Sequence, residues 1–281
     1  MKILVLGAGG MAGHLVATYL REKNHTVDTI GSKHPLDENT VILDLMNKND
    51  FEAFLTKNEY DAIINCVGIL VEQSEKRKDL STYLNSYLPH LLEQRYKDSK
   101  TKIIHLSTDC VFSGKNAPYK EDDVFDGELY YDRTKALGEI NNEKDLTLRM
   151  SIIGPEIQSD GIGLFNWFMK QHGQIYGFKG AIWNGVTTLE LAKGIDAALK
   201  QNLAGLHHFV PETNISKFDL LGLFKEAFDK KDIQIVPKEG VVANKTLLNT
   251  RKDFEFIVSD YKTMISEMHD WIITHKNMYD Y

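Results

Sequence analysis

A tyrosine and a lysine stand four positions apart at Tyr131 and Lys135, a spacing that puts both side chains on one helix face. A phenol with its ordinary pKa of about 10 is a ready proton donor at neutral pH, and a neighbouring ammonium stabilises the phenolate left behind. The pair can therefore protonate the oxygen of a carbonyl group during its reduction. An amphipathic helix face with a solvated lysine is the alternative, so the surrounding motifs must decide.

A threonine at the end of a predicted strand supplies a third group. Ser107 and Thr108 end the apolar run that begins at residue 102, and doubly wound sheets bind ligands at the carboxyl ends of their strands. The Thr108 hydroxyl can hydrogen-bond a carbonyl oxygen and orient it toward Tyr131. We predict that Thr108, Tyr131 and Lys135 are the catalytic residues.

A glycine-rich turn follows the first predicted strand, with glycines at positions 7, 10 and 13 before an amphipathic helix. Such a turn lets the backbone approach a pyrophosphate, while the helix N-terminus offers N–H groups to the anion. Glycines that only punctuate a turn are the alternative, but the place between strand and helix favours a dinucleotide site. The predicted cofactor contacts here are Gly7, Gly9, Gly10, Met11, Ala12 and Gly13.

The end of the second predicted strand bears on the choice of cofactor. An acidic residue there would bond the ribose 2′-hydroxyl of NAD, whereas small and basic residues admit a 2′-phosphate. The sequence has Ser32 and Lys33 at this place, which favours NADPH and leaves NADH open. Further cofactor contacts are expected at the ends of later strands, at Asp44, Leu45, Cys66, Val67, Gly68 and Ser107.

Apolar runs alternate with amphipathic stretches from the first residue, a pattern typical of βαβ units and a buried parallel sheet. The predicted class is α/β, a doubly wound parallel (Rossmann-like) sheet with a smaller C-terminal substrate-binding lobe. The strands are predicted over residues 2–6, 26–30, 41–43, 62–66, 102–107 and 146–150, and the intervening helices begin near residues 11, 49, 80 and 131.

Two regions are expected along the chain. Residues 1–150 are predicted to form an NADP-binding domain, to which a strand or helix near 182–210 returns, and residues 151–281 to form mainly the substrate-binding lobe. Helices are predicted over 189–200 and 217–230, the second with Ser216 as its N-cap. Trp183 precedes Asn184-Gly185 in a segment expected to be an exposed turn, so we predict that it binds substrate.

Composition limits the partners. The net charge of −7 argues against nucleic acid. The apolar runs are far shorter than the roughly 20 residues of a membrane-spanning helix, and the N-terminus does not resemble a secretory signal, so no membrane and a cytoplasmic location are expected.

Residues that could suggest a metal site have simpler interpretations. Cys66 and Cys110 lie in apolar runs and are expected to be buried thiols. His207 and His208 should point to opposite faces of a strand, one inward and one outward. Glu121-Asp122-Asp123 is expected to be solvated. We therefore predict no metal.

The motifs together resemble those of the extended short-chain dehydrogenase/reductases, and among them the dTDP-4-dehydrorhamnose reductases and related sugar-nucleotide reductases. The likeness rests on residues 7–13, 65–68, 107–114, 118–123, 131–135 and 148–149. It implies the catalytic roles given above, places Asn85 near the cofactor or a water relay, and has Lys135 bond the nicotinamide ribose. Val111, Phe112 and Arg149 are the further expected substrate contacts.

The function expected from this resemblance is NADPH-dependent reduction of a 4-keto-6-deoxy sugar nucleotide for surface polysaccharide. Segments 151–155 and 181–188 depart from the typical reductase pattern, so the nucleotide and the sugar stay open, as does a homodimer. Two alternatives remain: an NAD-dependent sugar-nucleotide epimerase or dehydratase, and a non-catalytic NADP-binding regulatory subunit.

Overall fold

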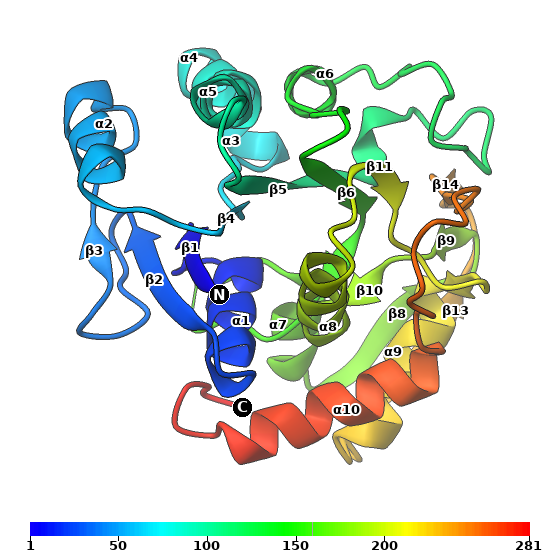
Figure 1. The fold of residues 1–281 in the computed structure, drawn as a ribbon. Helices are drawn as coiled ribbons and strands as arrows, with labels where there is room; N and C mark the ends of the chain where they lie inside the picture. Colours follow the sequence, from blue (N-terminus) through cyan, green and yellow to red (C-terminus); the bar gives the residue numbers. More distant parts are fainter. Residues whose placement is uncertain (159) are drawn as a thin grey trace.

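The computed structural model describes residues 1–158 and 160–281. In these residues a seven-stranded parallel sheet has the order β11-β6-β5-β4-β1-β2-β3 (Figure 1). Its strands are β1 (Lys2–Leu6), β2 (Thr26–Gly31), β3 (Val41–Ile42), β4 (Ala62–Asn65), β5 (Lys102–Thr108), β6 (Leu146–Met150) and β11 (Gly205–His208). Each strand predicted from an apolar run is present with ends that differ by at most one residue, and the predicted fold class is confirmed.

Helices cover both faces of this sheet (Figure 1). Alternate side chains of a strand point to opposite faces, so Ile3 and Val5 join one core while Leu4 and Leu6 join another. The first core packs against α1 (Met11–Glu22) and α8 (Thr188–Lys200), and the second against α2 (Lys48–Lys57) and α5 (Leu88–Tyr96). Burial on both faces explains why these strands are apolar without alternation.

A helix begins at Lys78, close to the predicted start near residue 80, but the segment between β4 and β5 is not one regular helix. It contains α3 (Val71–Lys76), α4 (Lys78–Ser81), the π-helix η1 (Thr82–Tyr87) and α5. Asn85 lies within the π-helix, where its amide accepts from the Ile69 N–H at 2.9 Å and donates to Thr134 Oγ1 at 3.2 Å. These partners are distant in sequence, so local periodicity does not predict this geometry.

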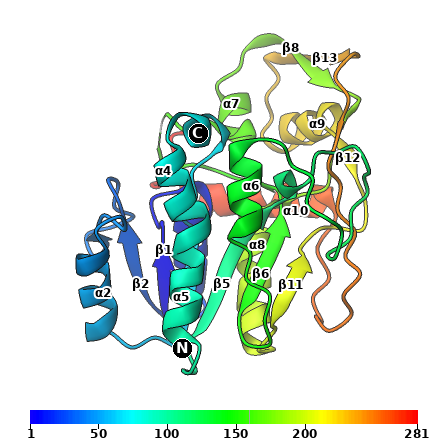
Figure 2. The same ribbon diagram turned by 90° about the horizontal axis from the view of Figure 1, so that it is seen from above.

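The later part of the chain adds small sheets beyond the carboxyl ends of the main strands (Figure 2). There β8 (Gly173–Phe178) pairs with β13 (Ile233–Lys238), β9 (Ala181–Trp183) lies between β12 (Ile215–Ser216) and β14 (Ala243–Asn244), and β7 (Ile152–Ile153) pairs with β10 (Val186–Thr187). With them are α7 (Leu164–Met169) and α9 (Lys217–Ala227). Ser216 caps α9 as predicted, because its Oγ accepts from the Asp219 N–H at 3.0 Å.

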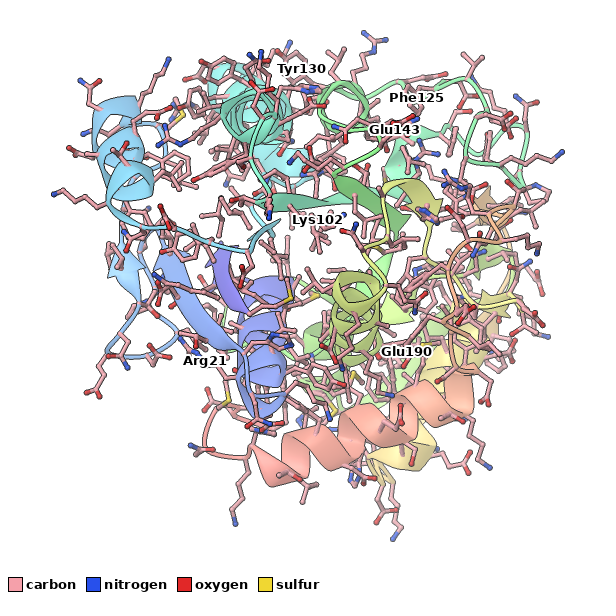
Figure 3. The ribbon with its side chains drawn as sticks, viewed as in Figure 1. Arg21, Lys102, Phe125, Tyr130, Glu143 and Glu190 are labelled. Atoms are coloured by element: carbon pink, nitrogen blue, oxygen red, sulfur yellow. The ribbon has the colours of Figure 1, made fainter. Side chains whose placement is uncertain are left out.

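Two segments after residue 150 pack against the first sheet. β11 pairs in parallel with β6, and α8 packs against α1. Helix α10 (Tyr261–Thr274) is linked to α8 by Lys193, which pairs with Glu190 and Glu267; Figure 3 shows Glu190 on the side of α8 that faces α10. The division near residue 150 into a cofactor domain and a substrate lobe stays a prediction.

None of the helices in the described part of the chain is both long and apolar enough to cross a membrane.

Candidate active site

The sheet order reverses between β1 and β4, because the chain proceeds from β1 to β2 and β3 on one side and from β4 to β5 on the other. A crevice forms where neighbouring strands send their connections to opposite sides. A cavity of about 780 Å³ opens at this point. Its lining contains the predicted cofactor residues Gly7, Gly9, Gly10, Ser32, Lys33, Asp44, Leu45, Cys66, Val67 and Gly68.

The glycine turn has the shape that a pyrophosphate requires. Gly7 has φ +79°, and a Cβ on Gly13 would lie 2.1 Å from the Gly7 carbonyl oxygen, so the turn and the first helical turn pack too closely for side chains. No side chain of the described residues caps Gly10 at the start of α1, which leaves N–H groups for an anion. Met11, Ala12 and Gly13 are in this first turn and do not line the cavity themselves.

A buried histidine supports the glycine turn from within α1. His14 Nδ1 lies 2.9 Å from the Gly10 carbonyl oxygen, and Nε2 lies 3.0 Å from the Tyr279 hydroxyl, which also accepts from Trp271 Nε1–H at 3.0 Å. Burial lowers the pKa of His14 to about 4, so the ring is neutral. Sequence analysis missed this support because its partners are at the two ends of the chain.

The loop after β2 presents basic rather than acidic groups to the cavity. Ser32, Lys33 and His34 line it, whereas the nearby Asp37 is ion-paired with Arg21. Among the described lining residues the one carboxylate is Asp44, whose Oδ1 accepts from the Met46 N–H at 2.9 Å. This donor set fits the 2′-phosphate of NADPH.

Several lining residues were missed by sequence analysis. They are Ile30, Gly31, Leu43, Met46, Arg77, Leu80 and Leu84. Arg77 carries an exposed guanidinium that is paired with Asp79, and a guanidinium is a side chain that can bind phosphate. The charged run around it was the available signal, but such runs usually form a solvated surface.

The predicted catalytic residues lie together at the carboxyl end of β5. Helix α6 (Tyr130–Leu137) carries Tyr131 and Lys135. Thr108 Oγ1 donates to Asp109 Oδ1 at 3.1 Å, and the hydroxyl lies near enough to the Tyr131 phenol to act on its pKa. Burial raises the pKa of Tyr131 well above its ordinary value, more than the Thr108 hydroxyl lowers it. The phenol is therefore a proton donor throughout the physiological pH range.

Lys135 lies behind this site rather than at its surface. Its side chain is buried, and Nζ donates to the Leu106 carbonyl oxygen at 2.7 Å. Burial lowers the pKa of Lys135 to about 8, against the opposing fields of Glu139 and Cys66. Cys66 also lines the cavity, so this cysteine connects the catalytic residues with the crevice.

Arg149 is fully buried in the structure, and its predicted role as a substrate contact stays a prediction. Its guanidinium donates to both Glu139 carboxylate oxygens, at 2.8 and 2.6 Å, and to His208 Nε2 at 2.7 Å. The rings of Phe112 and Phe125 lie beside it, and Figure 3 labels Phe125 in the loop before α6. Arg149 therefore neutralises a buried carboxylate.

Four other predicted contacts are also buried in the structure, and their roles stay predictions. The Val111 and Phe112 side chains are fully buried, with Phe112 stacked on Tyr119 at 4.1 Å between ring centroids. Ser107 Oγ donates to Glu139 at 2.6 Å rather than facing the cavity. Asn85 is buried and does not line the cavity.

Trp183 lies in strand β9 and is buried, not in an exposed turn. Its Nε1–H donates to Ser151 Oγ at 2.8 Å, and Lys217 Nζ lies 4.9 Å from the ring centroid. The prediction that one of His207 and His208 faces outward is also wrong, since both are 1% exposed. Phe254 lies against His207, whereas Phe112 and Glu121 lie against His208.

The two cysteines are free thiols and only partly buried. Burial raises the pKa of both Cys66 and Cys110 to about 12, so neither is a thiolate nucleophile at neutral pH.

A charged group next to Tyr131 was not anticipated. Asp109 follows Thr108, and the positive charges of Lys217 and Lys245 act on its carboxyl group. Burial raises the pKa of Asp109 and lowers that of Lys217 to about 8. The lysines come from regions near residues 217 and 245, whose position beside β5 is a consequence of the fold.

A doubly wound sheet with a glycine turn at its crevice and a Thr–Tyr–Lys group beside it defines an extended short-chain dehydrogenase/reductase. The family model described as RmlD substrate binding domain matches residues 1–245. The chain therefore belongs to the RmlD substrate binding domain family.

Individual relatives agree with this assignment. The chain is 30% identical over 142 residues to a probable dTDP-4,6-dihydroxy-2-methyloxan-3-one 4-ketoreductase of Streptomyces antibioticus, covering 50% of this chain and 45% of that protein. It thus spans about half the length of the curated relatives it matches.

Solved structures match over nearly the full length. A dTDP-4-dehydrorhamnose reductase from Clostridium acetobutylicum has a TM-score of 0.80 at 23% identity, covering 97% of this chain and 100% of that one. The enzyme of the same name from Bacillus anthracis, in complex with NADP, has a TM-score of 0.81 at 18% identity, covering 96% and 99%. At these identities the likeness establishes the shared fold.

Proposed function

We propose that the chain is an NADPH-dependent reductase of a ketone on a nucleotide-linked 6-deoxy sugar. The observation that carries this proposal is the position of Thr108, Tyr131 and Lys135 at the carboxyl end of β5, next to the 780 Å³ crevice. Family membership and the names of the relatives support it. The product is a deoxysugar nucleotide of the kind used for surface polysaccharide.

The glycine turn would hold the pyrophosphate of NADPH and Ser32 and Lys33 its 2′-phosphate, and the bound cofactor would supply the hydride. Tyr131 donates its phenolic proton to the carbonyl oxygen, and the Thr108 hydroxyl orients that oxygen by a hydrogen bond. The positive form of Lys135 stabilises the phenolate that remains. Because Tyr131 and Thr108 are almost fully buried, their hydrogen bonds act with little competition from water.

The alternative of an NAD-dependent epimerase or dehydratase is less well supported. An acidic side chain at the end of β2 would favour NAD, but Ser32, Lys33 and His34 line the crevice there. Asp37, in the same loop, is occupied by Arg21.

The test uses a matched pair of tyrosine variants. The purified protein is mixed with NADPH or NADH and an enzymatically generated 4-keto-6-deoxy sugar nucleotide, and nicotinamide absorbance is followed. Tyr131→Phe should lower kcat by roughly 10²- to 10⁴-fold, the usual contribution of a proton donor. Tyr130→Phe is the control, because Tyr130 is the first residue of α6 and its hydroxyl bonds Thr82 at 2.6 Å (Figure 3).

Oxidation of NADPH that is retained by Tyr130→Phe and lost by Tyr131→Phe is the expected result. NADPH binding without turnover on any such substrate would reject the sugar assignment. A fully active Tyr131→Phe variant would reject the catalytic assignment.

A further inference from the structure

Three buried polar side chains form a row between the main sheet and helix α6. Asn65 ends β4, His105 lies opposite it on β5, and Lys135 comes from α6. Asn65 and His105 are 0% exposed and Lys135 is 4% exposed. Asn65 Nδ2 is 3.2 Å from His105 Nδ1, and His105 Nε2 is 3.4 Å from Lys135 Nζ. The mechanism above gives no role to Asn65 or His105.

The hydrogen bonds of Asn65 determine which nitrogen of His105 carries the proton. Asn65 Oδ1 accepts from the Val67 N–H at 3.1 Å, so its NH₂ group faces the imidazole and donates to Nδ1. Nδ1 must then be unprotonated. Burial lowers the pKa of His105 well below its ordinary value, and a neutral ring with an unprotonated Nδ1 carries its hydrogen on Nε2.

That N–H is directed at the Lys135 nitrogen, and an N–H needs an acceptor. An ammonium group has three donors and no acceptor, whereas a neutral amine has a lone pair. The amine form of Lys135 can accept from His105 and still donate to the Leu106 carbonyl oxygen, which is 2.7 Å away. The row therefore stabilises the amine relative to the ammonium, so that Lys135 loses its proton at a lower pH than an isolated lysine does.

The other groups that face this row do not reverse the preference. Glu139, after α6, favours the ammonium, but its carboxylate is paired with Arg149. The Cys66 thiol is uncharged, since burial raises its pKa to about 12. His90 on α5 acts on His105 and is itself paired with Glu93. Burial of Lys135 acts in the same direction as His105 and lowers the lysine pKa to about 8.

We propose that His105 is a positioning residue, held in one tautomer by Asn65, that sets the protonation state of Lys135 and thereby the pH range in which the site works. Only the expected effect of His105 on the reaction rate rests on the proposed reductase function. The protonation state itself is a property of the folded protein and can be measured without any substrate.

The first experiment measures urea unfolding against pH for the wild type, Lys135→Met, His105→Gln and the double variant. The pKa of Lys135 is about 10.5 in the unfolded chain and about 8 in the folded protein. As the pH falls, the unfolded chain therefore binds the extra proton first. The wild type therefore loses stability relative to Lys135→Met between about pH 10.5 and about pH 8, and the difference is constant below that.

In the His105→Gln background the amide oxygen can accept from the ammonium, so the lysine should charge more readily. The pH at which the stability difference becomes constant should rise by at least about one unit, a tenfold change in the protonation equilibrium. An unchanged pH would overturn the proposal. His172→Gln, at an exposed histidine paired with Asp232, should leave the profile unchanged.

A second variant keeps His105 and removes what fixes it. Asn65→Leu frees Nδ1 to take the proton, so Nε2 can accept from the ammonium, and the same upward shift is expected. If His105→Gln does not fold, this variant decides the question, and an absent shift would count against the proposal.

With an active enzyme, His105→Gln should move the alkaline limb of the kcat profile upward by about one unit while kcat at pH 7 is largely kept. A purely structural role would instead lower kcat at every pH and leave the limb in place. If no turnover is found in the wild type, the reductase proposal fails while the unfolding experiment still tests His105.

Discussion

The crevice and the catalytic corner, the group of Thr108, Tyr131, Lys135, Glu139 and Arg149 near the carboxyl end of β5, differ in how they use charge. The crevice presents exposed cations, Lys33 and Arg77, and backbone N–H groups at the start of α1. The catalytic corner buries its charged and titratable groups: Glu139 and Arg149 are hydrogen-bonded to each other, and Lys135 donates to the Leu106 carbonyl oxygen. A large anion needs donors that it can reach, whereas proton transfer needs groups whose pKa is controlled by burial and partners. The two regions should therefore respond differently to the same kind of substitution.

The largest difference in stability between the two regions is expected when an arginine is replaced by leucine. Arg149→Leu leaves the buried Glu139 carboxylate without its partner and should lower the free energy of unfolding by about 3–5 kcal/mol. Arg77→Leu breaks the exposed pair with Asp79 and should leave the unfolding midpoint unchanged. Urea unfolding of the two variants measures the contrast, and equal losses would remove the distinction between the regions.

A smaller loss of stability is expected when a glycine is replaced in the turn that borders the crevice. Gly13→Ala places a methyl group 2.1 Å from the Gly7 carbonyl oxygen, which should cost about 1–3 kcal/mol of stability and weaken NADPH binding. Gly222→Ala in α9, where nothing lies within 4 Å of the new methyl group, should stabilise the protein by up to about 1 kcal/mol. Calorimetric titration with NADPH and thermal unfolding check both. A Gly13→Ala variant with unchanged NADPH affinity would contradict the assignment of this turn.

The smallest effect is expected at Lys33. Lys33→Ala should raise the Kd for NADPH about fivefold, the size of one exposed ion pair, and leave the Kd for NADH unchanged. The difference should shrink as salt is added. Fluorescence titration of both cofactors measures it, with Lys57→Ala at the exposed end of α2 as the control. An equal loss for both cofactors would argue against a 2′-phosphate at this place.

The strands and the crevice could be predicted from sequence because their signals are local. Apolar runs are bounded by polar turns, and the glycine turn directly follows β1. Arg149, Trp183 and His208 could not be placed in this way, since their partners Glu139, Ser151 and Leu248 are chosen by the packed fold. A polar residue in a strand of a sheet covered on both faces is buried whichever way it points, and sequence alone does not reveal that cover. The row from Asn65 to Lys135 was missed for the same reason, because it joins three elements.

The residues that line the crevice all fall between Gly7 and Leu84, whereas Thr108, Tyr131, Trp183 and Lys217 come later in the chain. The crevice is thus lined by one continuous stretch of the chain, and the predicted catalytic residues Thr108, Tyr131 and Lys135 lie in a later one. An exchange of the later stretch would keep every residue that lines the crevice, but it would have to retain Tyr279, because this residue supports the glycine turn through His14. Chimeras joined in the loop between α5 and β5 are a direct way to exploit this arrangement.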